Sequence, residues 1–194
     1  MPSLVAPVLL AGSLAKHAQP ELTDGVVRLR HWRDDDVPAV LAAYSDPAIQ
    51  LWHARSMTPD EAVAWVRAWP ERWQREDGAG WAIELDGDVV GQISLRRIQL
   101  VDAWAEISYW VLPAGRGRGI APAALELLTE WAFTQVGILR LSLDHSTRNL
   151  PSCRVATKSG YQLEGTARRQ LLHPDGWHDM HQHARLNPAL DDPA

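Results

Sequence analysis

Arg116-Gly-Arg-Gly-Ile-Ala121 is the most informative segment of this sequence, because it joins a strand-like run, residues 105–112, to a helix pattern that reaches about Val136. Gly117 and Gly119 allow backbone conformations that other residues avoid, and they let a ligand approach closely. The first N–H groups of a helix have no internal partner, and the helix dipole favours an anion there. The stretch therefore predicts a cradle for a phosphate group.

A glycine-rich tight turn without a ligand is the alternative interpretation of this stretch. Two other phosphate-binding motifs fit poorly. The P-loop ends in Gly-Lys-Ser/Thr, whereas this sequence has Gly119-Ile-Ala. The dinucleotide fingerprint needs a third glycine where Ile120 stands.

Outward from this stretch, cap and turn signals alternate along the chain. Asp34–Asp36 offer an N-cap to a helix that should end near Tyr44, and Thr58-Pro-Asp-Glu61 is a capping box. Pro70 should kink or break the helix that this box opens. A short helix should start at Asn149 or Leu150 and end at Gly160. Strands are expected at residues 25–30, 80–85 and 89–99 (joined by Asp86-Gly-Asp88), 104–112, 139–145, 161–172 and 177–186.

Composition predicts one soluble, cytoplasmic domain. The chain has 194 residues, 46% hydrophobic and 22% charged, with a formal net charge of -5. A negative chain argues against binding nucleic acid through a basic face and mildly favours a cationic partner. One cysteine excludes an internal disulfide, and no apolar run is long enough to span a membrane.

Three segments follow from the pattern: a leader at residues 1–20, a domain at 21–187 and a tail at 188–194 that is expected to fray. The apolar run from Leu4 to Ala15 resembles the core of a signal peptide. The positively charged start that a signal peptide needs is missing, so we expect a leader ahead of the domain.

Arg116-x-x-Gly119-x-Ala121 matches the Q/R-x-x-G-x-G/A motif with which enzymes of the GNAT superfamily hold the coenzyme A pyrophosphate. Downstream, Asn149-x-x-Ser152, then Gly160-Tyr161 and Trp177-His-Asp179, resemble the RimJ/RimL type of ribosomal-protein N-acetyltransferase. The resemblance runs from about residue 22 to 186. It implies an α+β GNAT fold: a mixed, mostly antiparallel sheet, splayed between the fourth and fifth strands of the family, with helices on both faces.

The resemblance also implies direct transfer of an acetyl group from acetyl-CoA to a primary amine, in a ternary complex. The acceptor would be a protein N-terminus or a small amine, no metal is expected, and a homodimer is one candidate assembly. A non-catalytic coenzyme A-binding sensor or partner module is the alternative. The residues implied to bind the coenzyme are Val111, Leu112, Arg116, Gly117, Arg118, Gly119, Ile120, Ala121, Asn149 and Ser152.

Glu106 and Ser152 are the candidate catalytic residues. Glu106 stands in an apolar strand and matches the position from which GNAT enzymes draw a general base, while a structural salt bridge is the alternative. Ser152 would protonate the coenzyme A thiolate, because the tyrosine that many relatives use is replaced by Ala156. A helix cap is the alternative role for Ser152.

Trp52, His53 and Trp104 fall where the acceptor groove of the resembled enzymes lies. They could form an aromatic wall for a cationic amine. Ordinary core packing is the alternative for the tryptophans.

His178, His181 and His183 suggest a metal site, but strand alternation turns His178 away from the other two. No cysteine stands near them in the sequence, so we expect no metal site. Cys153 is expected to be a small buried residue rather than a nucleophile.

Overall fold

The computed structural model describes residues 4–191, which form one eight-stranded sheet in the order β1-β2-β3-β4-β5-β6-β8-β7. The β5–β6 pair is parallel and the other neighbouring strands are antiparallel. The strands are β1 (Leu22–Thr23), β2 (Val27–Arg30), β3 (Ala79–Leu85), β4 (Asp88–Gln99), β5 (Trp104–Val111), β6 (Arg140–Ser146), β7 (Gln162–His173) and β8 (Gly176–Leu186). The helices are α1 (Val37–Ser45), α2 (Pro47–His53), α3 (Pro59–Gln74), α4 (Ile120–Trp131) and α5 (Leu150–Lys158).

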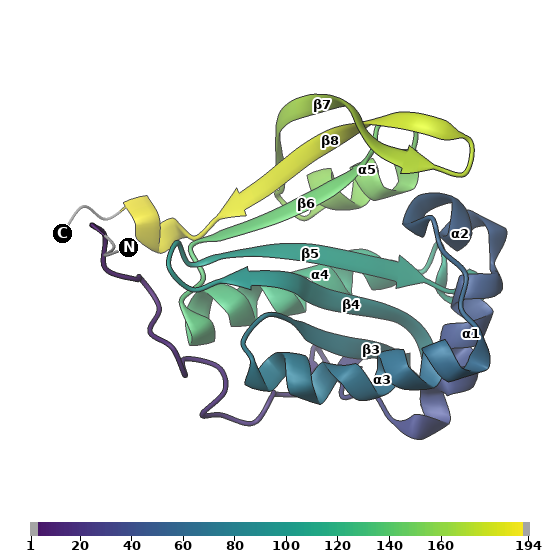
Figure 1. The fold of residues 1–194 in the computed structure, drawn as a ribbon, viewed down its shortest axis with the longest axis horizontal. Coiled ribbons are helices and arrows are strands. Elements are labelled where there is room, and N and C mark those ends of the chain that lie inside the picture. Colours follow the sequence, from purple (N-terminus) through teal and green to yellow (C-terminus); the bar gives the residue numbers. More distant parts are fainter. Residues whose placement is uncertain (1–3, 192–194) are drawn as a thin grey trace.

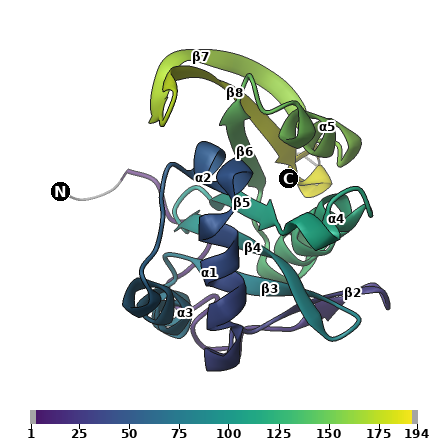
Figure 2. The same ribbon diagram turned by 90° about the vertical axis from the view of Figure 1, so that its right-hand side faces the viewer.

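Helices cover both faces of the sheet: α4 and α5 lie on one side and α1 to α3 on the other (Figures 1 and 2). The larger apolar cluster includes Trp81, Leu128 and Leu141, which are fully buried. A smaller cluster joins α1, α2 and α3 to Trp110 of β5. The predicted α+β architecture is therefore confirmed.

Local signals placed several elements correctly. Thr58 and Glu61 form the predicted capping box, with the Thr58 N–H donating to the Glu61 carboxylate at 2.7 Å. Asp86 and Gly87 both have positive φ in the turn between β3 and β4, as a tight hairpin requires. Asn149 caps α5 by accepting a hydrogen bond from the Ser152 N–H at 3.2 Å.

Two expectations at the helices on the α1–α3 side were only partly correct: Asp36 is the N-cap residue of α1 but not through its side chain, and Pro70 does not break α3. Asp36 does not cap α1 through its side chain; its carboxylate instead accepts both Nη groups of Arg30, at 2.7 and 2.8 Å. This bidentate pair is buried and ties β2 to the start of α1. Of the kink or break expected at Pro70, the break does not occur: α3 continues to Gln74, and the buried Trp69 and Trp73 pack its last turns against the core.

The sheet splays between β5 and β6, as the resemblance implied. Register pairs join the two strands only from Trp104–Arg140 to Ile107–Leu143. Beyond Ile107, β6 still pairs with β8 as far as Ser146, but β5 no longer has β6 beside it. No strand covers that edge of β5 beyond Ile107, so a ligand can approach it there, although the Tyr109 and Val111 carbonyls already accept hydrogen bonds from the His53 and Arg116 side chains.

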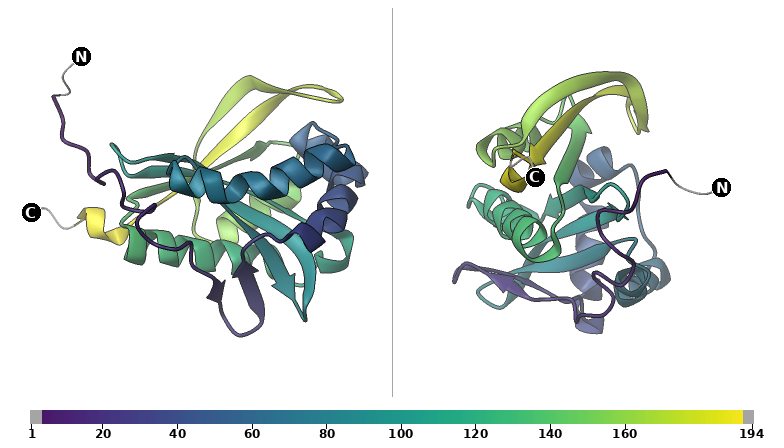
Figure 3. Two further views of the ribbon diagram at one scale, coloured as in Figure 1. Left: turned by 60° about the horizontal axis from the view of Figure 1, so that its bottom comes forward. Right: turned by 90° about the vertical axis from the view of Figure 1, so that its left-hand side faces the viewer.

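The segment before β1 packs on the domain. Leu14 is 2% exposed and belongs to the main core cluster. The Glu76 carboxylate accepts the N–H groups of Gly12, Leu14 and Ala15 at 2.6, 2.6 and 3.2 Å. Figure 3 shows the segment running along the domain before it enters β1. Within residues 4–191, no helix is both long enough and apolar enough to cross a membrane.

Candidate active site

A cleft of about 590 Å³ is lined by residues from the end of β5 and from the N-terminal ends of α4 and α5. Figure 2 shows these elements on one side of the molecule. Helix α2 and the last residues of β5 close its other side. Of the residues predicted to bind coenzyme A, eight line it: Val111, Arg116, Gly117, Gly119, Ile120, Ala121, Asn149 and Ser152.

The phosphate cradle has the predicted backbone geometry. Gly117 and Gly119 both have a φ of +76°, and Gly119 is the N-cap of α4. A Cβ at either glycine would meet no heavy atom within 4 Å. The space beside them is thus open to a ligand, and the N-terminal end of α4 favours an anion there.

The two arginines of the motif have different partners. Arg116 donates to the Asp46 carboxylate at 2.7 Å and to the Val111 carbonyl at 3.1 Å. It therefore fixes the cradle to the start of α2 and the end of β5. The Arg118 side chain instead reaches Asp86 in the β3–β4 turn, 3.7 Å away, and does not line the cleft.

The end of β5 contributes Val111 to the cleft but not Leu112. The Leu112 N–H donates to the Val90 carbonyl at 2.8 Å, and its side chain packs against the α1–α3 cluster. The Leu112 carbonyl accepts the Gly115 N–H at 2.9 Å, so both backbone polar groups of Leu112 already have partners within the protein.

Ser152 and Tyr109 form a hydroxyl pair at the splayed end of the cleft, with 2.8 Å between the Tyr109 Oη and the Ser152 Oγ. Burial raises the pKa of Tyr109 to about 12, so this phenol stays protonated and can donate a hydrogen bond. Sequence reasoning missed Tyr109, because it sought a tyrosine at position 156. The N-cap role considered for Ser152 belongs to Asn149.

Glu106 lies on β5 outside the residues that line the cleft. Its side chain is 13% exposed and pairs with Arg96 at 3.1 Å and with Arg97 at 3.7 Å. Burial raises the pKa of Asp144 on β6, and the negative charge of Glu106 raises it further. Asp144 is thus within electrostatic range of Glu106. Asp144 could not be found from the sequence, because its nearness to Glu106 depends on the register of β5 on β6, in which Glu106 pairs with Ser142.

The predicted aromatic wall is only partly assembled. Trp52 and His53 line the cleft from α2. Trp104 stands at the first residue of β5, at the opposite end of the strand from Val111, and does not line the cleft. Burial lowers the pKa of His53 to about 4, and its Nε2 lies 3.2 Å from the Tyr109 carbonyl. His53 is therefore a neutral ring at neutral pH.

The C-terminal histidines divide into two groups. His178 stacks on His173, with ring centroids 4.2 Å apart, and both rings lie near Trp52. His181 and His183 face the other way, as strand alternation predicted, and contact His145 of β6.

A glycine-rich helix start, a splayed strand pair and a hydroxyl pair meet at one cleft, an arrangement that suits an acyltransferase using a coenzyme A thioester. The family model described as the acetyltransferase (GNAT) domain matches residues 27–162. The chain therefore belongs to the GNAT family, and it is an N-acetyltransferase that depends on acetyl-CoA.

Known proteins agree with this membership. The chain is 23% identical to the uncharacterized N-acetyltransferase YoaA of Bacillus subtilis, over 86% of this chain and 96% of that protein. It is 29% identical to the ribosomal-protein-serine acetyltransferase of Escherichia coli, over 58% of this chain and 63% of that enzyme. The structure of Mycobacterium smegmatis RimJ with CoA-disulfide superposes with a TM-score of 0.78 at 27% identity, covering 89% and 88% of the two chains.

Proposed function

We propose that this enzyme transfers the acetyl group directly from acetyl-CoA to the primary amine at a protein N-terminus. The cleft that joins the phosphate cradle to the Ser152–Tyr109 pair carries the proposal of acyl transfer. Similarity to a ribosomal-protein-serine acetyltransferase and to RimJ supports a protein acceptor.

In the proposed mechanism, the pyrophosphate of acetyl-CoA binds at residues 116–121 and its pantetheine arm follows the free edge of β5. The amine nitrogen attacks the thioester carbonyl carbon, and the carbon–sulfur bond then breaks. The amine loses one proton, and the departing thiolate takes up one from Ser152. Tyr109 holds the Ser152 hydroxyl in place through their hydrogen bond, and solvent returns a proton to Ser152 before the next turnover. Holding the two reactants side by side contributes to the rate as well.

Glu106 is the proposed general base. Its side chain pairs with Arg96 and lies on the face of β5 that also carries Trp110, on the α1–α3 side. Since Glu106 does not line the cleft, the proton must reach it through water. Burial makes His53 a poor base, so we assign His53 and Trp52 to the wall that contacts the acceptor.

The test is an acceptor panel. Acetyl-CoA is incubated with the enzyme and with peptides that differ at the N-terminus, free amino acids, polyamines or an aminoglycoside, and products are identified by mass spectrometry. The expected result is a mass gain of one acetyl group at the peptide α-amine. Acetylation of the small amines alone would move the assignment to a small-molecule acceptor. No release of free thiol with any acceptor would instead support the non-catalytic coenzyme A-binding module.

A further inference from the structure

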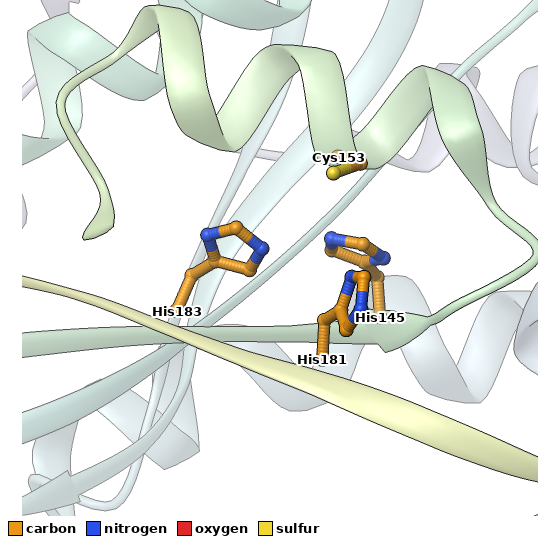
Figure 4. A group of neighbouring side chains, drawn as sticks. All are labelled: His145, Cys153, His181 and His183. Carbon is orange, nitrogen blue, oxygen red and sulfur yellow. The ribbon is translucent and has the colours of Figure 1, made fainter. Parts of the chain in front are cut away.

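Four side chains that bind metals in other proteins meet on the side of α5 that faces β6 and β8: His145 of β6, Cys153 of α5, and His181 and His183 of β8 (Figure 4). One ligand atom from each residue lies within 4.8 Å of the others. His145 and His181 are register partners on neighbouring strands, and His183 lies two residues further along β8.

The ring nitrogens of this cluster are arranged as in histidines that ligate a metal. The Nδ1 atoms of His145 and His183 lie 2.8 and 3.1 Å from the carbonyl oxygens of Ser146 and Tyr161. A carbonyl only accepts, so each Nδ1 carries the proton and each Nε2 presents a lone pair. A hydrogen bond from the second ring nitrogen to a carbonyl is the usual support for a metal-bound histidine.

Those lone pairs have no partner. The Nε2 atoms of His145 and His183, and the Nδ1 of His181, are buried without a hydrogen-bond partner among the residues that the structure describes. His145 and His183 are only 4% and 2% exposed. Leaving a buried polar atom unpaired costs roughly 1–3 kcal/mol, so three such atoms beside one thiol need an explanation beyond packing.

Ring stacking explains only part of the arrangement. The rings of His145 and His183 stack with centroids 5.0 Å apart and an interplanar angle of 26°. That contact involves only the faces of the two rings. The Nε2 atoms, which lie in the ring planes, still have no hydrogen-bond partner among the described residues. A metal ion would satisfy all three nitrogens and the thiol at once.

We propose that His145, Cys153, His181 and His183 bind one zinc ion in a tetrahedral Cys₁His₃ site. Bond lengths of about 2.0–2.3 Å place the ligand atoms of such a site about 3.3–3.8 Å apart. The present spacing of up to 4.8 Å therefore closes by side-chain rotation. On binding, the Cys153 thiol releases its proton to solvent and the sulfur bonds to the ion as a thiolate.

This ion is structural and takes no part in acyl transfer. Four protein ligands leave no open position for a substrate, and none of the four residues lines the cleft, within the described part of the chain. Cys153 follows Ser152 directly and lies in the first turn of α5. The ion thus fixes the helix that carries Ser152 to the β6–β8 pair. No cysteine stands near these histidines in the sequence, and for that reason no metal was expected; in the structure α5 brings Cys153 to them.

The test uses the full chain, stripped with a chelator and titrated with Co²⁺ and then with Zn²⁺. We expect one Co²⁺ per chain, with the visible absorption of tetrahedral cobalt and a near-ultraviolet band from thiolate to metal. Zn²⁺ should displace Co²⁺ and slow the reaction of Cys153, the one cysteine of the chain, with a thiol reagent. No Co²⁺ binding, or a bound ion that gives no thiolate band and leaves Cys153 equally reactive, would overturn the proposal.

Variants localise the ion. Cys153→Ser and His183→Gln should each weaken Zn²⁺ binding by more than the roughly 10- to 100-fold that loss of an outer partner costs. His178→Gln is the matched control, because it removes a buried histidine of the same strand that faces away from the cluster. Circular dichroism shows whether each variant folds. Equal Zn²⁺ affinity in the wild type and in a folded His183→Gln protein would show that the ion lies elsewhere.

Discussion

At the scale of single residues, the Ser152–Tyr109 hydroxyl pair gives the first prediction. Ser152→Ala should lower turnover by about 10- to 100-fold, since it removes the group that we propose as proton donor to the thiolate. Because Asn149 is the N-cap of α5, the melting temperature should change little. Tyr109→Phe keeps the ring and should lower turnover less. Turnover and melting are measured on the same samples. A lower melting temperature with unchanged turnover would mean that Ser152 is structural.

Glu106 gives the second prediction. Glu106→Gln should lower turnover by about 10²- to 10⁴-fold if the carboxylate is the general base, while the affinity for coenzyme A stays the same. Arg97→Gln is the control, because it removes the longer of the two ion pairs of Glu106, at 3.7 Å, and should leave turnover near wild type. Steady-state rates across pH decide the matter. If a folded Glu106→Gln enzyme kept wild-type rates, Glu106 would not be the general base, and its role would be the structural ion pair with Arg96.

His53 gives a prediction about pH and stability. Its folded pKa of about 4 lies below the ordinary value of about 6.5. In the unfolded chain the His53 side chain therefore takes up a proton below about pH 6.5, whereas in the folded protein it does so only near pH 4. From pH 6.5 to 4 this difference lowers the free energy of unfolding by about 3 kcal/mol. In urea titrations, His53→Gln should lose less stability than wild type between these two pH values. Parallel losses would contradict the prediction.

At the scale of elements, the N-terminal end of α4 decides whether the coenzyme binds. In Gly119→Val, a side chain enters the open space beside the cradle, and acetyl-CoA affinity should fall more than tenfold, or about 1.4 kcal/mol. Gly87→Val is the matched control: Gly87 also has positive φ and open space around its Cβ. It pays the same backbone strain of roughly 1–2 kcal/mol in the β3–β4 turn, so it should bind normally. If calorimetry gave the two variants equal affinities for acetyl-CoA, the phosphate site would not lie beside Gly119.

The sequence predicted the elements whose signals are local. The capping box at Thr58, the Asn149 cap and the Asp86-Gly87 turn each depend on residues within a few positions of one another. One local signal was overlooked: Asp46 caps α2 and Pro47 begins it, as Thr58 and Pro59 do for α3. Reading that pair in the same way would have found α2.

Contacts between distant residues could not be predicted in this way. Tyr109 and Ser152 are 43 positions apart, and they meet only because β5 ends beside the first turn of α5. Cys153 lies beside the histidines because its position in α5 turns its side chain toward β6 and β8. The Glu106 ion pair with Arg96 depends on an irregularity in the β4–β5 register. Residue patterns alone do not show which residues of two strands pair, or which side chains of a helix meet those of a distant strand.

At the scale of the whole molecule, the sheet consists of two parts, β1 to β5 and β6 to β8, joined by four residue pairs of the β5–β6 seam. The cleft lies at this seam, with the cradle and the α2 wall attached to the first part and α5 following β6 on the second. A bound acetyl-CoA would contact both parts. It should therefore raise the melting temperature of the whole domain.

The segment before β1 gives a prediction about the whole molecule, because it packs against the domain from outside the sheet. Leu14 is buried, whereas Leu10 on the same segment is 68% exposed. Leu14→Ala should lower the free energy of unfolding by about 2–5 kcal/mol, and Leu10→Ala, the matched control, by much less. Urea titrations measure both.

A second variant tests whether this segment docks as a unit. Glu76→Gln removes the charge of the carboxylate that accepts three N–H groups of residues 12–15, and so weakens these hydrogen bonds. If either change releases the whole segment, the loss in the double variant will be smaller than the sum of the two single losses, since each variant already forfeits the contacts of the other. Additive losses would mean that Leu14 and Glu76 act independently. An unchanged stability in Leu14→Ala would contradict the docking itself, because a buried leucine cannot be truncated without cost in a packed core.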